Sequence, residues 1–269
     1  MHSFDFSYHD SLPTDRVGLA RMTRSPVVET KERPALVFVH GSMHGAWCYS
    51  HWLKAAHEAG IAATAVDVRG HGGLPNEDLF TAGFNEYGDD VAVIAQTFDH
   101  PPVLLGHSMG GLMVGVAATR APVSGLVLLT PSPPANLPGA EAVTPVDETR
   151  PVPPANEKTV REKFLPNHEG QDISAMLERQ CPESSVATND RYKLRVSVDV
   201  SKITCPALSI SAGRDWPLTH PPGQDAAVGA FYGAEHVHLP DAAHCLMIDV
   251  DWQPGWEVIL DWYNRVFPA

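Results

Sequence analysis

Cysteine is scarce in this chain, and no spacing pairs the few thiols that it has. The four residues are Cys48, Cys181, Cys205 and Cys245, and no two of them form a Cys-x-x-Cys motif. Disulfide frameworks and zinc fingers depend on closely spaced cysteines, so the pattern argues against both. We therefore expect buried free thiols in a protein of the reducing cytoplasm.

Long apolar runs and an excess of basic residues are also missing. No stretch approaches the roughly 18 apolar residues of a membrane span. The 19 basic and 32 acidic residues give a formal net charge of −13, which disfavours nucleic acid and anionic membranes as partners. Residues 1–5 are polar and acidic, unlike a secretory signal. What is present, 43% hydrophobic residues in a chain of 269, allows a sizeable core.

Apolar runs alternate with helix-compatible segments along most of the chain. Strands are predicted over residues 35–39, 61–68, 103–107, 125–129, 206–211 and 235–239, and the first two are expected to be buried. Helices are predicted over residues 46–59, 86–98, 112–118 and 254–265, and residues 16–22 and 26–29 are expected to be edge strands. This alternation predicts an α/β fold with a mostly parallel central sheet flanked by helices.

The pattern breaks after the sixth predicted strand. Eight prolines lie between Pro131 and Pro154, which excludes a regular strand or helix there. Short helices are expected over residues 157–165, 173–180 and 183–198. We interpret residues 131–204 as a cap inserted over the carboxyl edge of the sheet, and residues 1–130 and 205–269 as the core domain.

Residues 103–111 read Val-Leu-Leu-Gly-His-Ser-Met-Gly-Gly and join a predicted strand to a predicted helix. Gly-x-Ser-x-Gly in this context is typical of a nucleophile elbow. The sharp turn would hold the hydroxyl of Ser108 away from the backbone, and Gly106 and Gly110 remove side chains that would collide there. The alternative is a glycine-rich turn without chemistry.

A serine nucleophile needs a base and a carboxylate that orients the base. Asp215 comes shortly after the strand at 206–211, and His244 lies in the loop after the strand at 235–239. Ser108 also follows a strand, so all three can meet at one sheet edge. The order Ser108, Asp215, His244 is one of the known chain orders of such triads.

Alternatives stay open for these residues. Asp215 can be a turn-forming residue, with Asp241 or another acid in its role, and His244 can be structural. We interpret His107 as a packed, hydrogen-bonded neighbour of the nucleophile. A metal cluster could be formed by His236, His238, Asp241 and His244. Their spacing is not diagnostic of a metal site, so we predict none.

An oxyanion needs two converging N–H donors. We assign one to the backbone of Met109, at the start of the helix that follows Ser108. The other is expected in the loop after the strand at 35–39, where Gly41 allows close approach and the N–H of Ser42 is our choice. A buried His40 would fix this loop by hydrogen bonds.

Over about residues 30–267 the chain resembles the α/β-hydrolase superfamily. His-Gly-Ser-Met-His-Gly-Ala-Trp-Cys at 40–48 and Gly-His-Ser-Met-Gly-Gly at 106–111 are similar to motifs of its methylesterase/hydroxynitrile lyase branch. The resemblance implies cleavage of a carboxylic ester by an acyl-enzyme route without a cofactor. It also supports Ser42 and Met109 as backbone oxyanion donors.

Departures from the branch refine this expectation. Its lyases carry Thr where this chain has Gly41, and Lys directly after the catalytic histidine, where this chain has Cys245, so an esterase is favoured over a lyase. Asp replaces Ser108 in epoxide hydrolases and haloalkane dehalogenases, so those reactions are not expected. The Arg-Gly-His-Gly turn at 69–72 and the proline-rich entry to the cap are more like bacterial hydrolases.

The expected partner is a small-molecule ester, lactone or thioester. A carbon–carbon bond hydrolase, a perhydrolase or an acyl transferase would use the same triad, and a small-molecule binding protein on this scaffold is the alternative without catalysis. The oligomeric state, monomer or homodimer, stays open. The pocket walls that we expect are Gly41, Met43, His44, Thr130 and Trp216.

Overall fold

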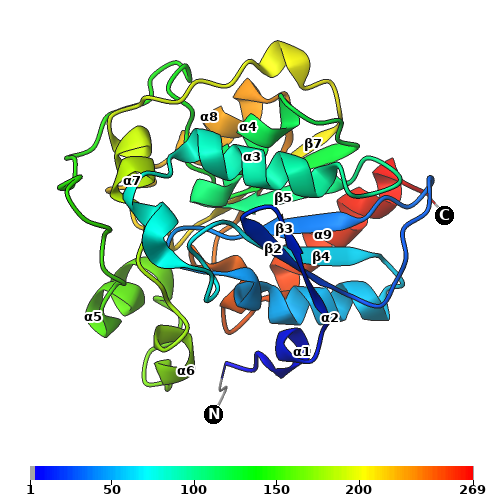
Figure 1. The fold of residues 1–269 in the computed structure, drawn as a ribbon, viewed down its shortest axis with the longest axis horizontal. Coiled ribbons are helices and arrows are strands. Elements are labelled where there is room, and N and C mark those ends of the chain that lie inside the picture. The colour runs from blue at the N-terminus through cyan, green and yellow to red at the C-terminus, as the bar shows by residue number, and fades with distance from the viewer. Residues whose placement is uncertain (1–3, 269) are drawn as a thin grey trace.

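One sheet of eight strands forms the centre of the computed structural model, which describes residues 4–268 (Figure 1). In chain order the strands are β1 (Thr14–Val17), β2 (Ala20–Arg24), β3 (Leu36–Val39), β4 (Ala63–Asp67), β5 (Val103–His107), β6 (Gly125–Leu129), β7 (Ala207–Ala212) and β8 (Glu235–Leu239). Their order in the sheet is β1-β2-β4-β3-β5-β6-β7-β8. The pairs β1–β2 and β2–β4 are antiparallel and the other five pairs are parallel, so the predicted mostly parallel sheet is confirmed.

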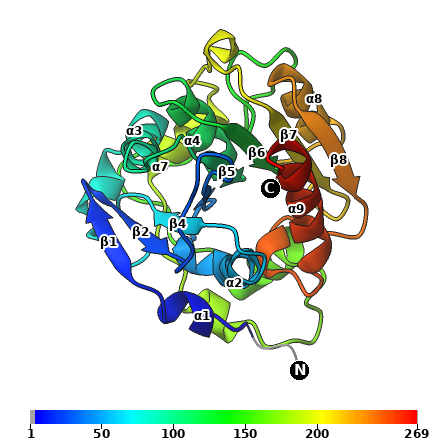
Figure 2. The same cartoon turned by 90° about the vertical axis from the view of Figure 1, so that its right-hand side faces the viewer.

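Helices cover both faces of this sheet, as predicted. They are α1 (Ser7–Asp10), α2 (Ser50–Glu58), α3 (Phe84–Ala95), α4 (Met109–Ala118), α5 (Glu157–Thr159), α6 (Ser174–Leu177), α7 (Ser185–Tyr192), α8 (Gln224–Phe231) and α9 (Gln253–Val266). Helices α3, α4 and α8 lie on one face, and α2 and α9 lie on the other (Figures 1 and 2).

The central strands, β3 to β7, are buried along their whole length because helices cover both faces of the sheet there, whereas β1 and β8 at the edges are largely exposed. In β3, Leu36 and Phe38 belong to the core under α2 and α9, whereas Val37 and Val39 belong to the core under α3 and α4. Successive side chains of a strand point to opposite faces, so a continuous apolar run supplies both cores.

The amino-terminal edge differs from the sequence prediction. Residues 14–24 form a hairpin, β1 and β2, that turns at Gly18 with a φ of +59°. The strand expected over 16–22 was therefore wrong, because it runs across this turn. No strand forms over 26–29, which is irregular. Helix α8 was not predicted, since its residues lack a clear apolar period.

The segment 131–204 connects β6 to β7 and carries α5, α6 and α7, which lie on the left of Figure 1. Val160 and Met176 join the core under α2 and α9, and Ala187 and Val198 join the other core. The segment is therefore packed into the rest of the molecule at both faces, and its own apolar residues do not form a separate core.

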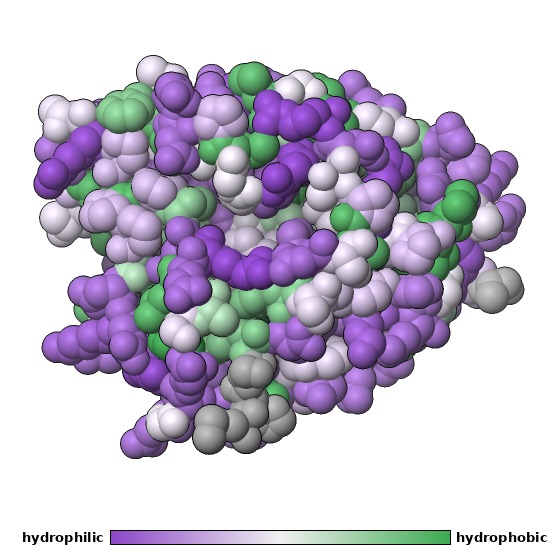
Figure 3. Space-filling view, turned by 60° about the horizontal axis from the view of Figure 1, so that its bottom comes forward, coloured by the Kyte–Doolittle hydropathy of each residue, from purple (hydrophilic) through white to green (hydrophobic). Residues whose placement is uncertain are grey.

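Polar residues dominate the face of the molecule shown in Figure 3, and apolar residues gather there in a hollow that polar residues border. Within residues 4–268, no helix combines the length and the apolar character that crossing a bilayer demands. All four cysteines are free; Cys48 and Cys245 are buried, whereas Cys181 and Cys205 are half-buried.

Candidate active site

Ser108 stands in the sharp turn between β5 and α4 with a φ of 53° and a ψ of −117°. This is a strained conformation for a residue with a side chain. Its backbone is held on both sides, because its N–H donates to the carbonyl of Leu129 over 2.9 Å and its carbonyl accepts from the N–H of Ser132 over 2.9 Å. The turn therefore has the geometry predicted for a nucleophile elbow.

The two glycines that flank this turn are required by close backbone contacts. A Cβ on Gly106 would collide with the carbonyl oxygen of Gly110. A Cβ on Gly110 would lie 2.5 Å from the carbonyl oxygens of both Val39 and His40. The start of α4 thus packs directly against the end of β3, and only glycine fits between them.

Asp215 and His244 meet beside this turn. Nδ1 of His244 lies 2.7 Å from Oδ2 of Asp215, and the N–H of Trp216 donates to Oδ1 of Asp215 over 2.6 Å. Burial raises the pKa of Asp215, but the nearby His244 and His220 and the hydrogen bonds lower it overall. The group is therefore a carboxylate that accepts from the imidazole. The alternative acid, Asp241, is exposed at the surface.

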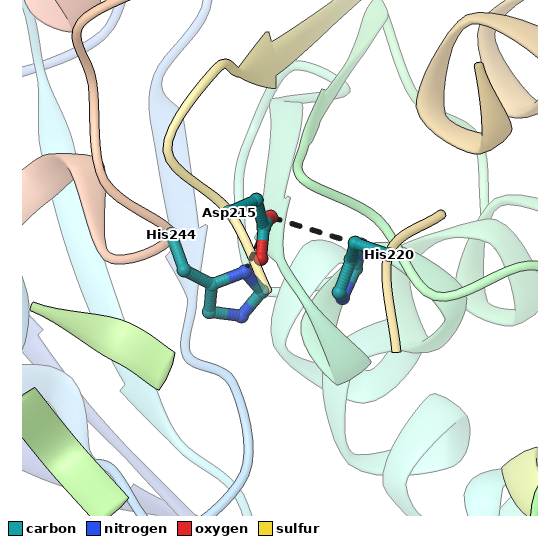
Figure 4. A group of neighbouring side chains, drawn as sticks. All are labelled: Asp215, His220 and His244. Carbon is teal, nitrogen blue, oxygen red and sulfur yellow. Dashed lines mark hydrogen bonds and ion pairs between the residues drawn. The ribbon is translucent and has the colours of Figure 1, made fainter. Parts of the chain in front are cut away.

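A second histidine lies against Asp215, and sequence reasoning did not find it. Figure 4 shows Asp215 between the rings of His244 and His220. Nδ1 of His220 lies 3.2 Å from Asp225 and 3.9 Å from Asp215. Burial lowers the pKa of His220, but these two carboxylates raise it overall. The only sequence signal was the chain position of His220, five residues after Asp215.

Asp215, His220 and His244 each offer one possible metal-ligand atom, and these atoms lie within 4.8 Å of one another. This group differs from the metal alternative considered in the sequence, because His236 and His238 lie within β8. The hydrogen bonds of the two imidazoles to Asp215 and Asp225 already account for the close approach. That the protein has no metal site stays a prediction.

The backbone of His244 is fixed by residues from two strand ends. Its carbonyl accepts from Nε2 of His107 over 3.0 Å and from the hydroxyl of Thr130 over 3.2 Å. The preceding N–H, on Ala243, donates to the buried carboxylate of Asp249 over 2.8 Å. His107 is therefore the packed, hydrogen-bonded neighbour that the sequence suggested.

Both peptide groups that flank the Cα of Ser42 are held in place. Nε2 of His40 accepts from the N–H of Val68 over 3.3 Å, so Nδ1 carries the proton and donates to the carbonyl of Gly41 over 2.8 Å. In a trans peptide the N–H points opposite to the carbonyl, so the N–H of Ser42 points away from His40. The next N–H, on Met43, donates to Oε2 of Glu183 over 3.2 Å.

Glu183 is a fully buried carboxylate that sequence reasoning also missed. It accepts from Tyr87 over 2.9 Å, from the N–H of Ser184 over 2.8 Å and from Nε2 of His71 over 3.2 Å. Nδ1 of His71 donates to a backbone carbonyl, so both ring nitrogens are donors and His71 is a cation. Burial raises the pKa of Glu183, but His71 and the hydrogen bonds lower it to about 2.

A pocket of about 260 Å³ opens beside the turn. Its walls include Ser108, His244 and both predicted oxyanion donors, Ser42 and Met109, together with Met43. Side chains of the 131–204 segment form another wall, from Val146 to Tyr192. The arrangement brings a strained serine, a histidine paired to a carboxylate and a helix N-terminus to one cavity.

The other predicted pocket residues are placed differently. His44 lines a smaller adjoining cavity. Gly41 packs against His107 and Ser108, where a Cβ would lie 2.7 Å from Nδ1 of the histidine. Thr130 is fully buried behind His244, and the ring of Trp216 contacts Lys163 at 5.4 Å. Their predicted substrate contacts stay predictions.

Residues 36–254 match the sequence pattern of the family described as "Alpha/beta hydrolase family". The match covers most of the chain, so the protein belongs to the α/β hydrolase family. The predicted resemblance to this superfamily and its methylesterase branch is confirmed.

Individual relatives agree with this assignment. The chain is 40% identical to probable esterase PIR7A of rice over 88 residues, 32% of this chain and 34% of that protein. It is 33% identical to methylesterase 1 of Arabidopsis thaliana over 107 residues, 38% of this chain and 41% of that protein. The chain spans about a third of the length of the curated relatives it matches.

Solved structures show the same fold. Methylesterase MES16 of Arabidopsis superposes with a TM-score of 0.70 at 20% identity, over 86% of this chain and 99% of that chain. This structure and the two sequence relatives come from plants, so they give no support to the bacterial character expected from the turn at 69–72.

We expect Gly106→Ala to destabilise the fold by about 3 kcal/mol, because the new methyl group collides with backbone at the start of α4. Urea unfolding measures this. Gly60→Ala is the matched control: its Cβ meets nothing within 4 Å, and the left-handed backbone alone costs about 1–2 kcal/mol. Equal losses in the two variants would contradict the packing argument.

We expect Glu183→Gln to lower the free energy of unfolding by about 3–5 kcal/mol near pH 5–6, because it leaves the buried cation of His71 unpaired. The pKa of Glu183 is lowered from 4.5, so the stability that this carboxylate contributes is present above pH 4.5 and is lost as the pH falls toward 2. The pKa of His71 is raised from 6.5, so its contribution is present below pH 6.5 and lost as the pH rises through the folded value.

Urea unfolding across this pH range checks the profile, with Tyr87→Phe as control. That change removes one hydrogen bond to the same carboxylate and no charge, so it should lower the free energy of unfolding by about 1.5–3 kcal/mol, with no recovery as the pH rises above 6.5. A Glu183→Gln penalty that stays constant from pH 3 to pH 8 would refute the ion pair.

Proposed function

We propose that this chain is a serine hydrolase that cleaves a carboxylic ester of a small organic molecule through an acyl-enzyme. Ser108 is the nucleophile, His244 the base and Asp215 the carboxylate that orients the base. The observation that carries the proposal is the 2.7 Å contact between Nδ1 of His244 and Oδ2 of Asp215, beside a pocket that His244 shares with Ser108. The names of the relatives, esterase and methylesterase, support an ester as the substrate.

The chemistry follows from these positions. Asp215 accepts a hydrogen bond from Nδ1–H of His244, which leaves Nε2 unprotonated and able to take the proton of Ser108 as Oγ attacks the ester carbonyl. The imidazolium then donates this proton to the leaving alcohol as the C–O bond breaks. Water attacks the acyl-enzyme with His244 again as the base, and the acid product and free serine result.

The N–H groups of Ser42 and Met109 are the proposed donors to the oxyanion. Support comes from the fixed peptide groups around Ser42 and from the place of Met109 at the first turn of α4. Between Ser108 and His244 the described residues contain no hydrogen bond, and we expect one to form when substrate closes the site.

The segment 131–204 acts, in this proposal, as a cap that sets substrate specificity. Its side chains form one wall of the pocket, including Val152, Phe164 and Tyr192. It is also tied to the oxyanion loop, since the N–H of Cys181 donates to the carbonyl of Met43 over 3.0 Å and Glu183 accepts from the N–H of the same residue. A cap attached in this way couples the pocket wall to the oxyanion donors.

The first experiment is covalent labelling with a fluorophosphonate, followed by intact mass and peptide mapping. We expect one adduct, on Ser108, for the wild type and no adduct for Ser108→Ala or His244→Ala. Circular dichroism confirms that the variants are folded. A folded wild type that takes up neither this reagent nor a small sulfonyl fluoride would favour the binding-protein alternative.

Asp215→Asn should lower kcat/KM for small ester substrates by about 10⁴-fold, because the amide stabilises the wrong tautomer of His244. Asp241→Asn, at the exposed alternative acid, should leave kcat/KM within about twofold. Hydrolysis of 4-nitrophenyl acetate measures both. The reverse order of effects would transfer the orienting role to Asp241.

A further inference from the structure

The pocket beside Ser108 contains a buried cation that the described chain does not neutralise. Arg191, near the end of α7, lines the pocket and is only 6% exposed. Its guanidinium makes no ion pair and no hydrogen bond within residues 4–268, and Nη1 is buried without a partner. An unpaired charge away from water is costly in the folded state, so a site of this kind favours an anionic ligand.

The other inward-facing arginines of the chain show what is unusual here. Arg21 lies 2.7 Å from the carboxylate of Asp67, and Arg69 lies 2.7 Å from that of Asp90. Both are more exposed than Arg191. Among the described residues, Arg191 is the only buried arginine. Of these three arginines, the most buried is therefore the one that has no counter-ion within residues 4–268.

The rest of the pocket wall has the same electrostatic character. Lys163 and His220 also line it, and none of its described lining residues is aspartate or glutamate. Asp215 and Asp225 bond the two histidines, but they line a different cavity. In a protein with a net charge of −13, this wall is locally positive. Apolar side chains line the same pocket, including Val146, Val152 and Phe164.

We propose that Arg191 binds a carboxylate of the substrate, so that the substrate is an ester that also carries a free carboxylate. A monoester of an aliphatic dicarboxylic acid has this chemistry. The guanidinium matches a carboxylate with two parallel hydrogen bonds, and the apolar wall accepts the methylene chain that joins the acid to the ester. The inference rests on the proposed function, since it places the ester at Ser108.

The test compares two methyl esters of equal size and different charge. Monomethyl adipate carries a carboxylate, and the methyl ester of adipic acid monoamide carries a neutral amide in its place. Methanol release gives kcat/KM for each. We expect the wild type to prefer the acid by about 10- to 100-fold, the range for a hydrogen bond to a charged group.

Arg191→Met should remove this preference by lowering kcat/KM for monomethyl adipate alone. Arg191→Lys, which keeps the charge without the planar fork, should restore part of it. The matched control is Arg195→Met, because Arg195 is 39% exposed, pairs with Glu148 at 3.0 Å and lies outside the pocket wall. It should retain the wild-type preference.

Fluorophosphonate labelling of Ser108 separates the two proposals. If the wild type is labelled but hydrolyses both esters equally, the carboxylate site is wrong and the hydrolase proposal stands. If Arg191→Met lowers both rates equally, Arg191 has a structural role and the inference is overturned. If the folded wild type is labelled neither by the fluorophosphonate nor by the small sulfonyl fluoride, both proposals fail. For esters with slow turnover, calorimetric binding to Ser108→Ala gives the same comparison, and equal affinity for acid and amide would overturn the inference.

Discussion

The contact between the start of α4 and the end of β3 is the constraint on which the site depends. Gly110 lies so close to the carbonyls of Val39 and His40 that no side chain fits there, and Gly106 lies equally close to Gly110. This approach holds the backbone of Ser108 at a φ of 53° and brings the first turn of α4 to the loop of Ser42. The strained backbone of Ser108 persists because the sheet is packed on both faces, which leaves the turn no room to relax.

Buried carboxylates hold the loops around this contact in place. The carboxylates of Asp215, Glu183 and Asp249 each accept hydrogen bonds from backbone N–H groups, and each also pairs with a histidine. In a low-dielectric interior such groups are stable only when fully partnered, so each one fixes the loops that supply its partners. Glu183 thereby joins the 131–204 segment to the loop of Ser42. Arg191 is the exception to this rule, and its missing partner is what points to a ligand.

Much of the fold could be predicted because its signals are local. The run at 35–39 is apolar at every position, which is typical of a strand buried on both faces, and the Gly-x-Ser-x-Gly pattern specifies a turn by steric need. The first edge strand was wrong because β1 is polar and exposed and has no such signal, and the turn at Gly18 was not recognised. Helix α8 was missed because its buried residues are few and mostly small.

The sequence by itself predicted the strands of the core, the sharp turn at Ser108 and the positions of Asp215 and His244 just after strand ends. Each of these follows from a short pattern next to a predicted strand end, and parallel strands bring such ends together. Only the tertiary structure decided that His220 lies against Asp215, that Glu183 reaches His71 across 112 positions, and that Arg191 is buried without a counter-ion. Those facts depend on how the 131–204 segment packs over the sheet, and contacts between residues so distant in sequence leave no periodicity or spacing from which they can be read.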